Sequence, residues 1–383
     1  MEKIDSIKYE LLEEDKADET ASSIPFDPSK ISLQVRQPTI YNLMQRIQAN
    51  PQEINMNTFF QRHNNLWSDA DRARLIESML LRIPLPAFYF DGSDDECWLI
   101  VDGLQRLTTF YEFIGTKKLK LKELEYLKEY NGKGFDELPR NMQRRIEETQ
   151  ITAYIIQPGT PENVKFNIFK RINTGGIPLS PQEIRFALHQ GIASDFLDRL
   201  AIQDDFKKII DVLKVNRMEP QELVLRFLTF YLLGYKSYEP DMDSFLNCGM
   251  DKLEKCTQEK FDLLEKKFAV SMQRNLLLFN DKSFRKLSKQ NGKIRRGPLN
   301  KALFEIWSTS MANLDEKSFL VLYNKRKILF YDYLNFLKNN PEFIQSVSSG
   351  TSKKTAVTRR FEDLQCFIRK EIKNDSTNND ETI

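Results

Sequence analysis

The pattern of apolar and polar residues changes along the chain, from mixed strand and helix signals to helix signals alone. A helical period over 69–80 follows Ser68, a favourable N-cap residue, and the proline-containing stretch 83–86 must end it. Two β-rich runs, 88–90 and 97–101, flank a polar turn that contains glycine. Two later segments repeat the strand and helix patterns: 151–156 and 162–171. This alternation predicts an α/β domain.

The clearest boundary signal is formed by Ser180, Pro181 and Glu183, which combine an N-cap serine, a proline at the first helical position and a glutamate three residues after the cap. Gly191 supplies the matching helix stop. From about Asp195 onward the β-rich runs disappear. We therefore predict an α+β chain with an N-terminal domain over 26–194, an all-helical domain over 195–370, and polar tails at 1–25 and 371–383 that lack the apolar surface to become ordered.

Composition narrows the protein class. The net charge of the 383 residues is only +2, so any nucleic-acid contact must come from a local patch. The longest apolar run, 227–235, is about half the length of a bilayer-spanning helix, and the acidic N-terminus has no secretory pattern. The four cysteines form no C-x-x-C pair, which argues against a disulfide framework or a zinc knuckle. A cytoplasmic location is expected.

The segment 98–111 joins an apolar strand to a helix through Asp102 and Gly103. A glycine at such a junction lets a ligand approach the backbone, and free N–H groups at a helix N-terminus favour phosphate. Arg106 can add a bidentate contact to the same oxygens, and Asp102 is suited to hold Mg²⁺ or to orient a water. Strand-Asp-Gly-helix also occurs in many folds as a plain turn, so the spacing alone leaves both interpretations open.

A second cluster lies downstream, where Arg171 and Asn173 precede Gly175 and Gly176. The glycine pair is compatible with a simple helix cap and turn, or with a cradle of polar donors and accessible backbone. Trp67, after the Phe-Phe-Gln-Arg run that ends at Arg62, is expected to pack in the core.

These segments, in this order, resemble the N-terminal domain of the GmrSD-type modification-dependent restriction endonucleases. The shared pattern is Phe-Gln-Arg before a Trp, then Ile-Pro-Leu-Pro, Val-Asp-Gly-Gln-Gln-Arg-Leu-Thr-Thr, Arg-Ile-Asn-x-Gly-Gly and a Gln-Glu-Ile-Arg helix, matched nearly throughout 59–190. The resemblance implies a fold similar to that of ParB and sulfiredoxin. It also implies that an NTP binds with Mg²⁺ and is hydrolysed, coupled to attack on foreign DNA such as phage DNA.

Carried over by position, the resemblance implies a set of site residues. The catalytic candidates are Asp102, Gln105 and Arg106, with Asp102 also the candidate Mg²⁺ ligand. The nucleotide-binding candidates are Arg62, Gly103, Thr108, Arg171, Asn173, Gly175 and Gly176. The family's first glutamine is Leu104 here, which removes one amide from the turn unless that position simply packs inward. Sulfiredoxin's reactive cysteine has no counterpart in the turn.

The histidine count bears on the nuclease half of such proteins, a His-Asn-His domain that needs a histidine base and metal ligands. His63 and His189 are the only histidines, and both fall within the predicted N-terminal domain. We therefore expect an NTP-binding and hydrolysing protein that regulates attack on foreign DNA without a His-Asn-His nuclease of its own. The alternative is a non-catalytic sensor of nucleotide or nucleic acid that acts as a partner subunit.

The most basic stretch extends from Lys282 to Lys301, and its candidate contacts to a DNA backbone are Lys289, Lys293, Arg295 and Arg296. Such runs are also common as solvated helix faces and loops. A weaker second candidate comprises Lys353, Lys354, Arg359 and Arg360. Expected partners are a nucleotide, DNA and a separate effector or nuclease subunit, with no membrane.

Overall fold

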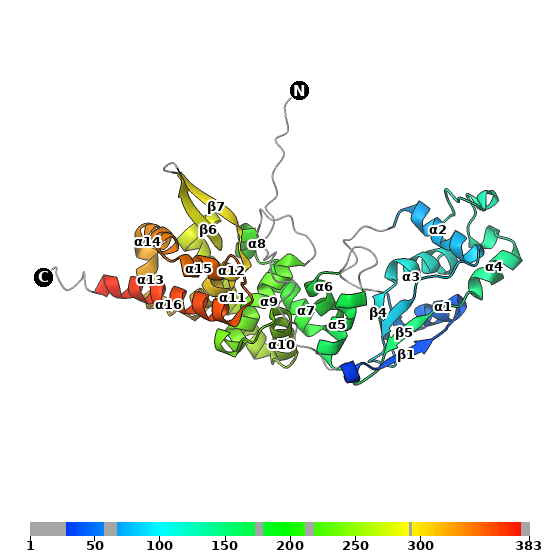
Figure 1. Ribbon diagram of the computed structural model, residues 1–383, viewed down its shortest axis with the longest axis horizontal. Coiled ribbons are helices and arrows are strands. Elements are labelled where there is room, and N and C mark those ends of the chain that lie inside the picture. Colours follow the sequence, from blue (N-terminus) through cyan, green and yellow to red (C-terminus); the bar gives the residue numbers. More distant parts are fainter. Residues whose placement is uncertain (1–27, 57–66, 173–178, 211–217, 291–292, 377–383) are drawn as a thin grey trace, which may run out of the picture. The chain divides into compact units, whose positions relative to one another are not determined.

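The computed structural model describes residues 28–56, 67–172, 179–210, 218–290 and 293–376, which form two compact units (Figure 1). The N-terminal unit ends at Leu188 and the C-terminal unit begins at His189. The first combines a small mixed sheet with helices and the second is mainly helical, as the predicted α+β class requires. The likeness to ParB and sulfiredoxin stays a prediction.

The N-terminal unit is built around five strands. Its elements are β1 (Leu33–Arg36), α1 (Ile40–Gln48), β2 (Ile54–Asn55), α2 (Asp69–Leu80), β3 (Phe88–Asp91), β4 (Trp98–Asp102), α3 (Leu104–Phe110), α4 (Arg140–Glu147), β5 (Ala153–Ile156), α5 (Glu162–Ile172) and α6 (Pro181–Leu188). The strand order is β1-β5-β3-β4-β2. β3 pairs in parallel with β5. It pairs antiparallel with β4, as expected because a short polar turn joins these two strands.

The main core lies on one face of this sheet. Side chains of α1, α2 and α3 pack there against inward-facing residues of the strands, among them Phe88, Phe90 and Ile100. Trp67 packs against the same core, as predicted. α5 packs against β4, and the Lys165 ammonium on α5 lies 3.4 Å from the Asp91 carboxylate on β3.

Local capping explains where two of these helices begin. The Ser68 hydroxyl accepts a hydrogen bond from the Asp71 amide, and the Asp71 carboxylate accepts one from the Ser68 amide. Ser180 and Glu183 make the same reciprocal pair at the start of α6. Each pair satisfies amide groups that a helix leaves without partners. Both predicted helix starts are confirmed.

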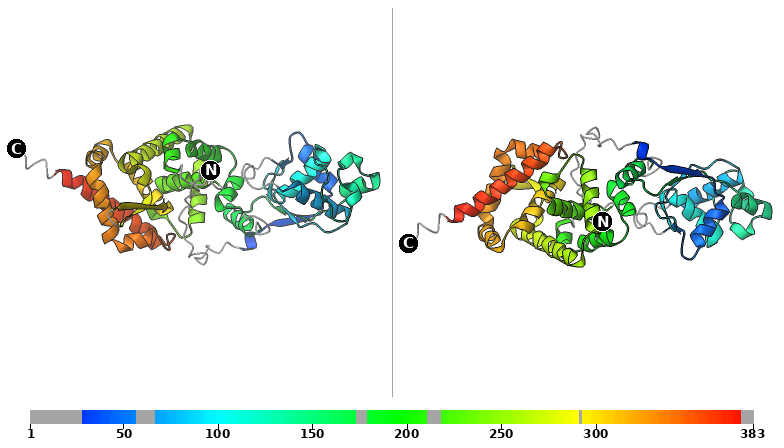
Figure 2. Two further views of the ribbon diagram at one scale, coloured as in Figure 1. Left: turned by 90° about the horizontal axis from the view of Figure 1, so that it is seen from above. Right: turned by 90° about the horizontal axis from the view of Figure 1, so that it is seen from below.

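The C-terminal unit is mostly helix. Its elements are α7 (Ile192–Ala201), α8 (Asp204–Ile210), α9 (Glu219–Leu233), α10 (Met242–Glu254), α11 (Gln258–Phe279), β6 (Arg285–Gln290), β7 (Lys293–Leu299), α12 (Lys301–Asn313), α13 (Glu316–Asn324), α14 (Arg326–Asn339), α15 (Pro341–Ser346) and α16 (Lys354–Ser376). The long α16 runs across the surface of this unit (Figure 2). Among the described residues, no helix is both long enough and apolar enough to cross a membrane.

The prediction that this unit is all-helical was wrong, because β6 and β7 form an antiparallel hairpin. Gln290 pairs with Lys293, and the two residues between them in the sequence are Asn291 and Gly292. Asn-Gly between two strands is a strong sequence signal for a two-residue hairpin turn. Leu287 is buried, at one of the apolar positions that alternate along the strand. The many charged residues of both strands obscured this alternation in the sequence.

A buried charge network joins three helices of the C-terminal unit. The two carboxylate oxygens of Glu305 on α12 lie 2.5 Å from Arg226 on α9 and 2.5 Å from Arg360 on α16. Glu222 pairs with both Arg226 and Lys301. A buried charge is costly unless it is paired, so these cations serve the fold. Arg360, a weaker candidate for nucleic-acid contact, is therefore not available for it.

Candidate functional site

The predicted site lies where β4 ends and α3 begins, at Gly103. This residue has a φ of +106°, and a Cβ atom there would lie 2.4 Å from a carbon of the Phe88 ring. Residues other than glycine rarely adopt such a φ, and the Phe88 ring leaves no room for a Cβ atom. The fold alone therefore requires glycine at this position, whether or not a ligand approaches it.

Arg106 is the most constrained side chain of the turn. Its Nη1 donates to the Pro86 carbonyl oxygen over 2.5 Å, and its Nη2 donates to the Ala87 carbonyl and to Asp102 Oδ2 over 3.2 and 2.6 Å. The guanidinium also lies over the Phe88 ring, 4.2 Å from its centroid. With its side chain only 9 % exposed, Arg106 holds the chain around strand β3 in place. Whether it also contacts phosphate stays a prediction.

Asp102 is the more accessible member of the pair, with 37 % of its side chain exposed. Burial raises the pKa of this carboxyl, although the Arg106 charge and the Gly103 amide oppose that effect. A carboxylate with a raised pKa that still reaches solvent has the properties of a general base. It is also an oxygen ligand suited to Mg²⁺.

A tyrosine that we did not predict lies beside Asp102, and a second tyrosine stacks on it. Tyr89 is opposite Asp102 in the β3–β4 ladder, where a bulge interrupts the register, and its ring stacks on Tyr154 with centroids 5.0 Å apart. Both rings are partly exposed. Alternation along β3 could have indicated Tyr89, since Phe88 and Phe90 on either side of it face the core.

The first turn of α3 divides into an inward and an outward part. Leu104 is buried in the core, so the residue that replaces the family's first glutamine packs inward. Gln105 and Thr108 are partly exposed, and neither side chain has a hydrogen-bond partner among the described residues. The amide that this chain retains is therefore the one on the accessible side of the turn.

The second predicted cluster is only partly described. Arg171 is exposed in the last turn of α5. Asn173, Gly175 and Gly176, like Arg62 further upstream, lie outside the described residues. Their proposed approach to the Asp102 turn stays a prediction.

Comparison with protein families identifies the domain that carries this turn. Residues 40–190 match the model of the GmrSD restriction endonuclease N-terminal domain. This part of the chain belongs to the GmrSD N-terminal domain family. The match begins with α1, includes the Asp102 turn and ends at residue 190, two residues beyond the N-terminal unit. No curated protein is significantly similar to the chain.

In this GmrSD domain, Arg106 links two of the motif segments that define the resemblance. Its guanidinium binds the carbonyls of Pro86 and Ala87, at the end of the Ile-Pro-Leu-Pro segment, while its own helix follows the Asp-Gly turn. The same segment borders a hollow of about 740 Å³, which Arg82, Arg144 and Arg145 also line. The two motifs therefore belong to one structural unit, although Arg106 and Pro86 are 20 positions apart in the chain.

His189, which we assigned to the GmrSD domain, lies within the family match and is also the first residue of the C-terminal unit. Its Nδ1 lies 2.7 Å from Glu254 Oε1, and its Nε2 lies 3.9 Å from Asp251 Oδ1. Within the described residues this is the group of three that could hold a metal ion. Each of the three residues offers one ligand atom, and Glu254 Oε1 is already within hydrogen-bond distance of His189 Nδ1.

The basic stretch forms the β6–β7 hairpin, and its cations differ in availability. Lys293 and Arg295 are exposed, two residues apart on one strand and hence on the same face. Arg296 donates to Asp281, Arg285 is buried, and Lys301 pairs with Glu222. The side chain of Lys289 lies outside the described part. DNA contact through this hairpin stays a prediction. Fewer of its cations are available for such contact than the sequence suggests.

Proposed function

We propose that the N-terminal unit binds an NTP with Mg²⁺ at the Asp102 turn and hydrolyses it, and that this turnover regulates attack on foreign DNA in a restriction system directed against phages. The observation that carries the proposal is the GmrSD family match, which includes a turn with a half-exposed carboxylate and an unpaired amide. The separate effector or nuclease subunit that such regulation needs is part of the proposal.

Asp102 is assigned to the metal and the attacking water. Mg²⁺ commonly binds proteins through one or two carboxylates and completes its shell with water and nucleotide phosphates, which a single half-exposed aspartate fits. When bound, the ion would neutralise phosphate charge. Asp102 would hold it or orient the water, Gln105 would donate to a phosphate oxygen, and Tyr89 would offer a flat surface beside them.

One observation favours the alternative, a nucleotide sensor without turnover. The guanidinium of Arg106, the positive charge nearest to Asp102 in the turn, is bonded to two backbone carbonyls and to Asp102 itself. A cation held in this way has fewer donors free for a transferring phosphoryl group. The packing of Leu104 favours neither alternative, because a side chain at position 104 faces the core.

Nucleotide binding is tested by Gln105→Ala. Losing one hydrogen bond to a charged phosphate costs about 1.5–3 kcal/mol, so affinity is expected to fall about tenfold or more in calorimetry with Mg²⁺ and ATP, GTP, CTP or UTP. Gln45→Ala removes an exposed glutamine from α1 and is the matched control. Equal affinities of both variants and the wild type would remove Gln105 from the site.

A second test concerns DNA cleavage. The purified protein with Mg²⁺ or Mn²⁺ and each NTP is expected to leave plain and base-modified plasmids intact, because a His-Asn-His site needs a histidine base and the sequence has no histidine beyond the family match. Strand breaks that disappear in His189→Ala or His63→Ala would refute this part of the proposal. Breaks that survive both substitutions would instead reveal an acidic metal site.

A further inference from the structure

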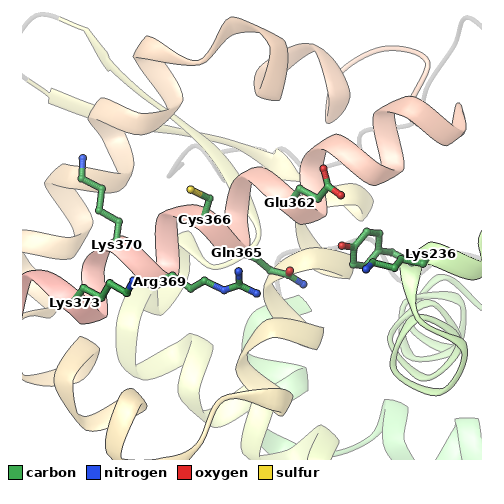
Figure 3. Close-up of a pocket in the computed structure, with 8 residues that line it drawn as sticks. Lys236, Glu362, Gln365, Cys366, Arg369, Lys370 and Lys373 are labelled. Carbon is green, nitrogen blue, oxygen red and sulfur yellow. The ribbon is translucent and has the colours of Figure 1, made fainter.

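A basic groove crosses the surface of the C-terminal unit beside α16. It has a volume of about 670 Å³ and is lined by Tyr235, Lys236, Glu362, Gln365, Cys366, Arg369, Lys370 and Lys373. All but the first two come from α16, and Tyr235 and Lys236 come from the 3-10 turn that follows α9. Figure 3 shows Gln365 and Arg369 extending from α16 toward Lys236. Neither the family match, which ends at residue 190, nor the predicted DNA contacts include this groove.

The positive charges of the groove outnumber its negative charges. Its lining holds four cations and the single carboxylate of Glu362. Within the described residues, Lys236, Arg369, Lys370 and Lys373 have no ion pair or hydrogen bond, whereas the nearby Arg360 on the same helix pairs with Glu305. Unpaired cations that converge on one concave surface create a positive potential there, which attracts a polyanion.

The spacing of the cations suits a chain of phosphates. Arg369 and Lys373 are one helical turn apart, about 6 Å along α16, with Lys370 between them in sequence. Lys236 adds a charge from a different element across the groove. A row of cations with a further cation opposite fits a linear polyanion better than one compact anion.

Aromatic side chains continue the groove. An adjoining hollow of about 390 Å³ shares Tyr235, Gln365 and Arg369 with it and adds Tyr231. The Tyr235 ring stacks on the buried Phe361 at 4.8 Å with an angle of 8°, which fixes its orientation, and the ring is partly exposed. A held aromatic ring beside a row of cations is the arrangement by which proteins bind single strands, whose unpaired bases can stack.

We propose that the groove along α16 binds single-stranded nucleic acid, with phosphates on Lys236, Arg369, Lys370 and Lys373 and a base against Tyr235. A duplex keeps its bases paired inside and cannot use the ring in this way. The proposal does not depend on nucleotide binding at Asp102, because it concerns the other unit and is tested without NTP.

The first measurement is the protection of Cys366, an exposed thiol in the groove lining. Alkylation of this thiol by iodoacetamide is measured by mass spectrometry. Oligothymidine or oligouridine is expected to slow the alkylation of Cys366. Cys248, which is exposed on α10, is the control and should react at an unchanged rate. Unchanged alkylation of Cys366, or equal protection by polyglutamate, would overturn the proposal.

The second measurement is affinity by fluorescence anisotropy. The double variant Arg369→Ala, Lys373→Ala is expected to bind the labelled single strand about tenfold more weakly, and the slope of log K against log salt should flatten by about 1.4. Lys266→Ala, Lys317→Ala removes two exposed cations of the same unit outside the groove and should bind like the wild type. Equal loss in both double variants, or tighter binding of a duplex of the same length, would contradict the proposed site.

Discussion

Replacing Arg106 by alanine is expected to lower the free energy of unfolding of the N-terminal unit by about 3 kcal/mol. The substitution removes three hydrogen bonds and the contact with the Phe88 ring. It also leaves the Pro86 and Ala87 carbonyls without this donor. We place the estimate at the low end of the range for buried pairs because Asp102 is partly exposed and can turn to water.

Hydrogen exchange of peptides from β3, β4 and α3 measures this loss within the whole chain. Arg106→Lys should recover less than half of it, because an ammonium cannot reproduce the planar fork that reaches two carbonyls and a carboxylate. Peptides from the C-terminal unit serve as the internal control. Wild-type protection in Arg106→Ala together with lost nucleotide affinity would show that Arg106 acts on the ligand and not on the fold.

Elements with local signals were predictable from the sequence. Ser68 and Ser180 cap their helices as their spacing indicates, and the polar turn between β3 and β4 joins two antiparallel strands. These features depend on residues a few positions apart, so a short window of sequence contains the whole interaction.

The role of Arg106 was not predictable in the same way. An arginine four residues after an aspartate in a glycine turn is compatible with phosphate binding and with a contact inside the protein. The choice depends on the Pro86 and Ala87 carbonyls, about 20 residues upstream. Their position is set by the pairing of β3 in the sheet, which no local pattern reveals.

A run of charged residues in the sequence does not show which of the charges are available for a ligand. The basic run between Lys282 and Lys301 contains Arg285, which is buried, and Lys301, which pairs with Glu222 from a distant helix. The groove beside α16 combines Lys236 with Arg369, which are far apart in the sequence. Free charge is a property of the folded surface, because it depends on which carboxylates the fold brings close.

Asp102→Asn is expected to reduce NTP hydrolysis about 100-fold or more, the usual contribution of a general base. The substitution preserves the shape of the side chain, and its amide oxygen can still accept from Arg106, so the fold should persist. Nucleotide affinity measured without Mg²⁺ should therefore remain near that of the wild type. Asp95→Asn, an exposed change in the β3–β4 turn, is the matched control and should keep full activity.

The rate of phosphate release by wild type, Asp102→Asn and Asp95→Asn, with Mg²⁺ and ATP, GTP, CTP or UTP in turn, tests nucleotide turnover at this site most directly. We predict release from at least one NTP by the wild type and Asp95→Asn, and a loss of about 100-fold in Asp102→Asn. Equal rates in all three proteins, or no release from any NTP by the wild type, would contradict the proposal that Asp102 takes part in NTP hydrolysis.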